Sequence, residues 1–245
     1  MSVKRQPEQR ATRQPGGGAC CAARACLLVL LAAWQPVLAD LIETVDRRML
    51  DGSIATVSDD GVRTVAGALV PWANVRRVLF DRTAVPASET RLLLRDGSIV
   101  SGVVRRLTQA RITFRSVALG EMDLGVDQIA AVQLAAKSTI RAVRDASATN
   151  VVAILRSGPT RSGSLVFASA SNVLIKTPDG LEKLAFENLS GLVFDRIPPP
   201  GGPGVVLRNG DVLCGAPQWS GTGLKASAGG VAVTISLDAV AEIRR

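Results

Sequence analysis

Short apolar runs separated by glycine turns recur along the chain after residue 40. In three stretches an apolar run ends in a turn glycine, and a second glycine follows five residues later. The runs and their glycines are 92–97 with Gly102, 152–158 with Gly163, and 205–210 with Gly215. Each stretch then closes on another apolar run, at 129–132, 189–192 and 240–243. Self-similarity at a fixed period is typical of a protein built from repeats.

A fourth copy precedes these three if Gly52 is taken as its second glycine. Its turn, Asp46-Arg47, lacks the glycine. Its ending, Val78-Leu79-Phe80-Asp81-Arg82, nevertheless matches Leu192-Val193-Phe194-Asp195-Arg196 of a later copy. The alternative is that the turns reflect only a β protein made of hairpins, in which glycines recur at loosely regular spacing.

The pattern within one copy predicts strands. In the second copy we expect a strand over 91–95, a two-residue turn at Asp96-Gly97 and a returning strand over 99–107. Further short strands are expected around 112–114, 118–124 and 129–134. Five strands in so short a segment favour a small barrel or half-barrel. The second glycine should lie where the returning strand bends, since a strand interior otherwise disfavours glycine.

The expected organisation is a leader, four β repeats and two linkers. The repeats are placed at 40–82, 83–134, 151–196 and 205–245. The linkers are placed at 135–150, where a short helix is expected, and at 197–204, which is rich in proline and glycine.

These glycine-punctuated strands resemble the SH3-like or Sm-like small β-barrel repeats of uncharacterised secreted bacterial proteins, chiefly of the planctomycete type. The resemblance covers residues 41–245 and rests on the turn glycine, the second glycine and the closing isoleucine-rich strand. It implies an all-β fold of about four tandem small barrels.

Residues 1–39 have the pattern of a secretory signal peptide. A basic segment precedes the apolar stretch 25–34, and Val37-Leu38-Ala39 predicts cleavage after Ala39. The apolar stretch is shorter than the roughly 20 residues of a membrane-spanning helix. We therefore expect a secreted, periplasmic or cell-envelope protein with no transmembrane segment after signal removal, although retention of the leader stays open.

Removal of the leader lowers the formal net charge. Of 29 Lys and Arg and 21 Asp and Glu, five basic residues and one acidic residue precede Asp40, so 24 − 20 leaves +4. Such a charge affects solubility and weak attraction to anionic surfaces. Cys214 becomes the only cysteine, and its apolar neighbours indicate a small core residue rather than a nucleophile.

The absence of histidine excludes the common hydrolytic triads and imidazole metal sites. Glu121 and Asp123 would share one strand face, the minimum for paired carboxylates, but a solvated strand face is the favoured explanation. Asp59-Asp60-Gly61 has too few oxygen ligands for a calcium loop, and residues 221–226 match only a loose dinucleotide motif. We predict no catalytic residue, metal or cofactor, with a carboxylate-based hydrolase as an alternative.

An Sm-like fold also implies an RNA alternative. Ser171-Asn172-Val173 is similar to the first Sm motif, but the basic residue of the second motif is missing beside Ser190-Gly191. Single-strand binding requires aromatic platforms, and we expect the five phenylalanines to face cores. The pairs Arg76-Arg77 and Arg105-Arg106 are expected on solvated strand edges. These points count against a nucleic-acid partner.

Trp72 and Trp219 are the remaining candidate ligand-contact residues. Each follows a proline closely and is expected to cap a small core. If both are exposed on one surface, binding of a polysaccharide becomes the better interpretation. We otherwise expect a non-enzymatic interaction or scaffold module whose partner is an envelope protein or a polysaccharide, and the sequence leaves its oligomeric state open.

Overall fold

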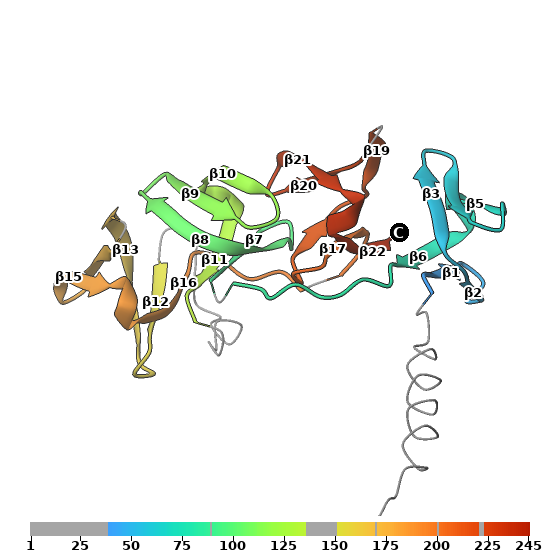
Figure 1. The fold of residues 1–245 in the computed structure, drawn as a ribbon. Helices are drawn as coiled ribbons and strands as arrows, with labels where there is room; N and C mark the ends of the chain where they lie inside the picture. The colour runs from blue at the N-terminus through green and yellow to red at the C-terminus, as the bar shows by residue number, and fades with distance from the viewer. Residues whose placement is uncertain (1–38, 89, 136–150, 170, 200, 221–222) are drawn as a thin grey trace, which may run out of the picture. The chain divides into compact units, whose positions relative to one another are not determined.

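The computed structural model describes residues 39–88, 90–135, 151–169, 171–199, 201–220 and 223–245. The predicted leader, except for Ala39, and the short helix expected within 135–150 lie outside these residues. The described chain is all-β, with one large sheet and two three-stranded sheets (Figure 1). None of its described helices is long and apolar enough to cross a membrane.

The same order of elements occurs in each of the four predicted repeats, which we call the first to fourth repeats. Four segments of β-strand are followed by a single 3-10 turn and a closing strand, and the second segment is split in the first and fourth repeats. The first repeat comprises β1 (Leu41–Thr44), β2 (Met49–Asp51), β3 (Ile54–Ser58), β4 (Gly61–Thr64), β5 (Leu69–Pro71), η1 (Trp72–Asn74) and β6 (Val75–Leu79). The second comprises β7 (Arg91–Leu94), β8 (Ile99–Leu107), β9 (Arg111–Ser116), β10 (Gly120–Gly125), η2 (Val126–Gln128) and β11 (Ile129–Gln133).

The third and fourth repeats continue this order. The third comprises β12 (Val151–Leu155), β13 (Thr160–Ala168), β14 (Asn172–Thr177), β15 (Gly180–Ala185), η4 (Phe186–Asn188) and β16 (Leu189–Val193). The fourth comprises β17 (Gly204–Leu207), β18 (Val212–Cys214), β19 (Gln218–Ser220), β20 (Gly223–Ala228), β21 (Val231–Ser236), η5 (Leu237–Ala239) and β22 (Val240–Arg244).

The second glycine lies where a strand changes partners. The N-terminal part of β8 pairs with β7 up to Ser101, and from Gly102 onward β8 pairs with β9. A Cβ atom at Gly102 would overlap the carbonyl oxygen of Arg115 on β9. Glycine is therefore required here by the close approach of the neighbouring backbone. The third repeat repeats this arrangement at Gly163.

The first turn of each repeat differs in detail from the predicted two-residue turn. Gly97 N–H donates to the Leu94 carbonyl at 3.0 Å, so Arg95 and Asp96 are the central residues and Gly97, with φ of 91°, follows them. This is the three-residue hairpin loop with a left-handed residue at its end. In the first repeat Arg47, with φ of 63°, occupies the position of that glycine.

No closed barrel is found among the described residues, so the predicted barrels are not confirmed. In the second repeat the strand order is β10-β9-β8-β7-β11, and β10 pairs only with β9. The strands therefore form an open, curled arrangement in which η2 connects the two ends. The buried residues belong almost entirely to one continuous apolar core.

The closing strands join the repeats in nested pairs. β6 of the first repeat pairs antiparallel with β22 of the fourth, and β11 of the second pairs antiparallel with β16 of the third. A single pair, Val212 with Ile99, connects β18 to β8. The shared endings of the first and third repeats serve equivalent joins, because Phe80 N–H donates to Ala241 O at 2.9 Å and Phe194 N–H donates to Ala130 O at 2.8 Å. The first repeat thus joins the fourth rather than its neighbour in sequence.

The phenylalanines face cores with one exception. Phe80, Phe114 and Phe194 are buried and Phe186 packs against the core from η4. Phe167 is 57% exposed, contrary to the prediction. The register of β13 with β14 shifts between Leu165 and Phe167, and this bulge moves Phe167 to the outer face. A bulge reverses the alternation that a simple strand pattern assumes.

Candidate functional site

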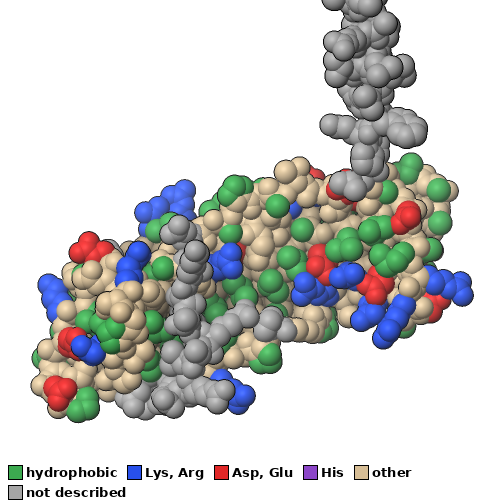
Figure 2. Space-filling model, turned by 90° about the horizontal axis from the view of Figure 1, so that it is seen from below, with side chains coloured by type: hydrophobic (Ala, Val, Ile, Leu, Met, Phe, Trp, Pro, Cys, Tyr) green, Lys and Arg blue, Asp and Glu red, His purple; other side chains and the backbone are tan. Residues whose placement is uncertain are grey.

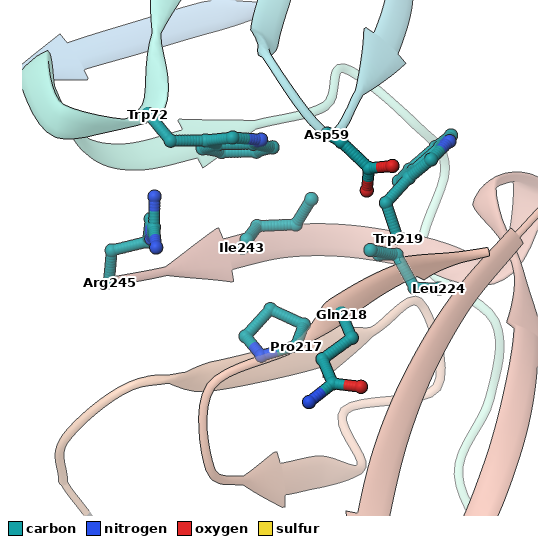
Figure 3. Close-up of a pocket in the computed structure, with 8 residues that line it drawn as sticks. All are labelled: Asp59, Trp72, Pro217, Gln218, Trp219, Leu224, Ile243 and Arg245. Atoms are coloured by element: carbon teal, nitrogen blue, oxygen red, sulfur yellow. The ribbon is translucent and has the colours of Figure 1, made fainter.

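Trp72 and Trp219 line the same pocket, at the join between the first and fourth repeats. The pocket has a volume of about 340 Å³. Its eight lining residues are Asp59, Trp72, Pro217, Gln218, Trp219, Leu224, Ile243 and Arg245 (Figure 3). Asp59 and Trp72 come from the first repeat, and the other six come from the fourth. The nested pairing of β6 with β22 is what brings these two groups together.

Trp72 is held by its position at the start of η1. Its indole Nε1–H donates to the carbonyl oxygen of Ser58 at 2.7 Å. The other repeats place Val126, Phe186 and Leu237 at the first residue of their 3-10 turns, and all four side chains pack against the core. The half-buried Trp72 therefore caps the core as predicted, and it also presents part of its ring to the pocket.

Trp219 is held by strand pairing. It lies on β19 opposite Leu224 of β20, which is buried. In the second repeat the corresponding pair is Leu107 with Ile112, both buried. Trp219 thus occupies an inward-facing position, but its larger ring remains half-buried and extends into the pocket.

Three polar side chains surround these apolar walls. The guanidinium of Arg245 lies 5.3 Å from the centre of the Trp72 ring, within the range of a cation–π contact. The carboxylate of Asp59 points between the two indoles, and Gln218 lies across from Trp72 (Figure 3). Apolar walls with a few convergent polar groups are typical of sites for small ligands or short segments of a polymer.

The sequence identified the two tryptophans but not their polar neighbours. Asp59, which the sequence excludes only from a calcium loop, begins the turn between β3 and β4. Neither Gln218 nor Arg245 belongs to a recognisable sequence motif. Only their positions could have indicated them, since Gln218 directly precedes Trp219 and Arg245 directly follows the strand β22.

Arg76 and Arg77 do not lie on a strand edge, contrary to the prediction. β6 pairs with β1 on one side and with β22 on the other, so it is an inner strand. Both arginines form ion pairs with Glu43, at 2.8 and 3.1 Å. β6 is an inner strand because β22 of the fourth repeat pairs with it. The sequence around Arg76 and Arg77 does not indicate this distant partner.

The catalytic candidates lie elsewhere. Glu121 and Asp123 are exposed on β10 and alternate with the buried Met122 and Leu124, and Asp123 pairs with Arg111 at 3.0 Å. This arrangement is an ordinary solvated strand face. Among the described residues, no three His, Cys, Asp or Glu side chains cluster so as to hold a metal ion.

Cys214 is a half-buried free thiol at the end of β18. Its burial, with a smaller contribution from the charge of Asp96, raises the pKa of the thiol. Since the thiolate is the reactive form, this environment disfavours nucleophilic chemistry.

The residues of the RNA alternative do not contribute to the pocket. Asn172, which carries the Sm-like motif, begins β14 in the third repeat, and its amide donates to the hydroxyl of Ser171.

Residues 223–226 of the loose dinucleotide motif begin strand β20, while 221–222 lie outside the described residues. A helix N-terminus, which a dinucleotide pyrophosphate requires, does not follow this motif in the described chain.

The pocket is thus characterised by its own residues: two half-buried indoles, one guanidinium, one carboxylate and one amide. These groups can stack against an apolar ring face and form hydrogen bonds at its rim. No protein-family model matches the chain, and no similar curated protein or solved structure was found.

Proposed function

We propose that the protein is a non-enzymatic binding module and that the pocket between Trp72 and Trp219 holds a segment of a polysaccharide. The observation that carries the proposal is the convergence of the two tryptophans from the first and fourth repeats on one pocket. Exposure of both on one surface is the condition under which the sequence favours a polysaccharide over a general scaffold role, and the two half-buried rings line the same pocket.

The chemistry of the pocket supports a sugar. One face of a pyranose ring is largely C–H and packs on an indole, whose ring face carries partial negative charge. The sugar hydroxyls then require polar partners at the edges, and Asp59, Gln218 and Arg245 provide acceptors and donors there. The volume of about 340 Å³ is small for a ligand site, which suits a short segment of a longer chain.

The carboxylates support binding rather than hydrolysis. Glycoside hydrolysis by carboxylates requires two of them on either side of the scissile bond. Of the eight residues that line the pocket, Asp59 alone is a carboxylate. The exposed pair Glu121 and Asp123 belongs to β10 of the second repeat and lines none of this pocket.

Intrinsic fluorescence tests the proposal directly. Of the three tryptophans, Trp34 lies in the predicted leader, so a chain of residues 40–245 reports on Trp72 and Trp219 alone. Titration with neutral and acidic polysaccharides should change the fluorescence in a saturable way. Unchanged fluorescence with every polysaccharide, together with no heat of binding by calorimetry, would contradict the proposal.

Matched variants separate ligand binding from core packing. By calorimetry, Trp72→Ala should weaken binding by about tenfold or more, the loss expected for an aromatic stacking contact. Trp72→Phe should remain folded, because the third repeat carries Phe186 at the same position, and it should bind with intermediate affinity. Phe186→Ala is the control, since it removes a core cap outside the pocket and should leave affinity unchanged.

A further inference from the structure

A second depression lies on the other face of the same join and is rich in arginine. It has a volume of about 450 Å³. Its lining residues are Glu43, Arg76, Arg77, Gly202, Pro203, Glu242, Arg244 and Arg245, which we call the arginine groove. Four guanidinium groups and two carboxylates leave this groove with two excess positive charges (4 − 2). Figure 2 shows basic side chains interleaved with acidic ones on the surface of this part of the molecule.

The pairing register of β1, β6 and β22 brings charged side chains of the groove side by side. Glu43 on β1, Arg77 on β6 and Arg244 on β22 lie side by side, because Glu43 pairs with Arg77 and Arg77 pairs with Arg244. On the opposite face the corresponding row is Ile42, Val78 and Ile243, all buried. The alternation of side chains along β6 and β22 therefore places Arg77 and Arg244 on the face opposite to Val78 and Ile243.

The two carboxylates position the arginines and neutralise only part of their charge. The side chains of Glu43 and Glu242 are only 13% and 12% exposed, whereas those of Arg76, Arg77 and Arg244 are 39–51% exposed. Glu242 accepts two hydrogen bonds from Arg244, at 2.9 and 3.1 Å. The guanidinium groups are thus held in place by acidic residues beneath them, while much of their surface faces solvent. Arginines arranged in this way are suited to fork-like contacts with a carboxylate or a sulfate.

The other join of closing strands has different chemistry. At the join of β11 and β16, the face of the sheet opposite the main core carries a second, buried apolar cluster. Its members are Leu93, Ala131, Val152, Ile154 and Val193. The arginine groove is therefore a property of the join that carries the tryptophan pocket. It is not a general feature of how two repeats meet.

Arg245 connects the groove to the tryptophan pocket. It lines both depressions, its guanidinium lies against Trp72, and its backbone N–H donates to Arg76 O at 3.0 Å. A polymer that stacks on the tryptophans can therefore continue past Arg245 into the groove. We propose that the ligand is an acidic polysaccharide whose carboxylate or sulfate groups bind in the arginine groove. This inference rests on the proposed function and specifies the class of its ligand.

The test compares three glycans and a nucleic acid on the leaderless chain. The probes are oligogalacturonate, dextran sulfate, neutral dextran and single-stranded oligo(dT), titrated by calorimetry. An acidic glycan should bind about tenfold more tightly than dextran at about 30 mM NaCl, and most of this advantage should disappear at about 300 mM NaCl because salt screens exposed charges. The two acidic glycans distinguish a carboxylate from a sulfate as the preferred group.

Charge reversal locates the contact. Arg76→Glu should remove the advantage of the acidic glycan and leave binding of dextran unchanged. Arg105→Glu makes the same change of charge at an exposed position on β8 outside both depressions, and should have little effect. Thermal unfolding of both variants followed by circular dichroism verifies that they fold.

The remaining outcomes distinguish failure of the arginine groove from failure of the proposed polysaccharide binding. Equal affinity for acidic and neutral glycans, unaffected by Arg76→Glu, would refute the role of the arginine groove and leave the proposed function standing. Binding of no glycan would refute both. Tight binding of oligo(dT), or of dextran sulfate in the absence of both tryptophans, would refute the inference, because the groove would then attract any polyanion.

Discussion

Asp211 provides the sharpest test of how the repeats are held together. It follows the turn glycine of the fourth repeat and has no exposed surface. Its Oδ1 accepts a hydrogen bond from Ser101 N–H of the second repeat at 2.7 Å, and its Oδ2 accepts one from the Asn209 side chain at 2.9 Å. In the reverse direction, Ser98 Oγ of the second repeat accepts from Cys214 N–H of the fourth at 2.9 Å. These contacts flank the single strand pair between β8 and β18.

Asp211→Ala removes both accepted hydrogen bonds. Ser101 is 1% exposed, so its N–H would lack an acceptor in a site that excludes water. A buried donor without a partner costs about 1–3 kcal/mol. The Asn209 amide, which is 7% exposed, loses its partner too, so we expect a net loss of about 2–3 kcal/mol in the free energy of unfolding at pH 4.5.

The loss should depend on pH. Burial is the main cause that raises the pKa of Asp211 above the ordinary 3.8, against the opposing effects of its hydrogen bonds and of Arg91. A carboxyl group whose folded pKa is raised contributes stability that is present below the unfolded pKa and is lost as pH rises through the folded pKa. The wild type should therefore gain this contribution as pH falls toward 3.8, and the alanine variant lacks it. The destabilisation should be larger at pH 4.5 than at pH 7.5.

Urea unfolding followed by circular dichroism at both pH values measures these differences. Asp238→Ala is the control, because the Asp238 side chain is 91% exposed in its pair with Arg82 and should contribute less than about 0.5 kcal/mol. A loss for Asp211→Ala that is smaller at pH 4.5 than at pH 7.5 would show that burial does not control this carboxyl group. A loss below about 0.5 kcal/mol at both values would show that Asp211 does not stabilise the contact between the repeats.

Three further predictions concern single positions. Gly102→Ala should destabilise the protein by about 3 kcal/mol or more in urea unfolding, because its Cβ would overlap backbone of β9, whereas Gly201→Ala, with open space at its Cβ, should change stability by less than about 0.5 kcal/mol. Arg47→Gly should stabilise the protein by about 0.5 kcal/mol, because it relieves the cost of a positive φ at this residue. Part of that gain is offset by the greater conformational freedom of glycine in the unfolded chain, and a measured loss of stability would contradict the prediction. Cys214 should react with a disulfide reagent more slowly in the native protein at pH 8 than in urea, because burial raises the pKa of its thiol, and equal rates would be inconsistent with that environment.

The strand content and the strand positions could be predicted from local patterns. The expected strand over 99–107 has the bounds of β8, and the second glycines at 102 and 163 lie where their strands change partners. These features are local, since a glycine permits a close backbone approach wherever the chain folds and alternation reports which face is buried. The prediction for Phe167 was wrong because a bulge inserts one residue into the alternation, and no local pattern marks that insertion.

Residue types alone selected Trp72 and Trp219, but the tertiary structure decided that they share a pocket. The shared pocket depends on the pairing of β6 with β22, which joins the first repeat to the fourth. This pairing brings Asp59 and Trp72 beside Gln218 and Trp219, and it brings Arg76 beside Arg244. Any closing strand of these repeats offers similar edge hydrogen bonds, so periodicity within one repeat cannot specify which other repeat it joins. That join also depends on side chains far apart in sequence that meet only in the folded chain, such as Arg77 of β6 and Glu242 of β22, which are 3.7 Å apart.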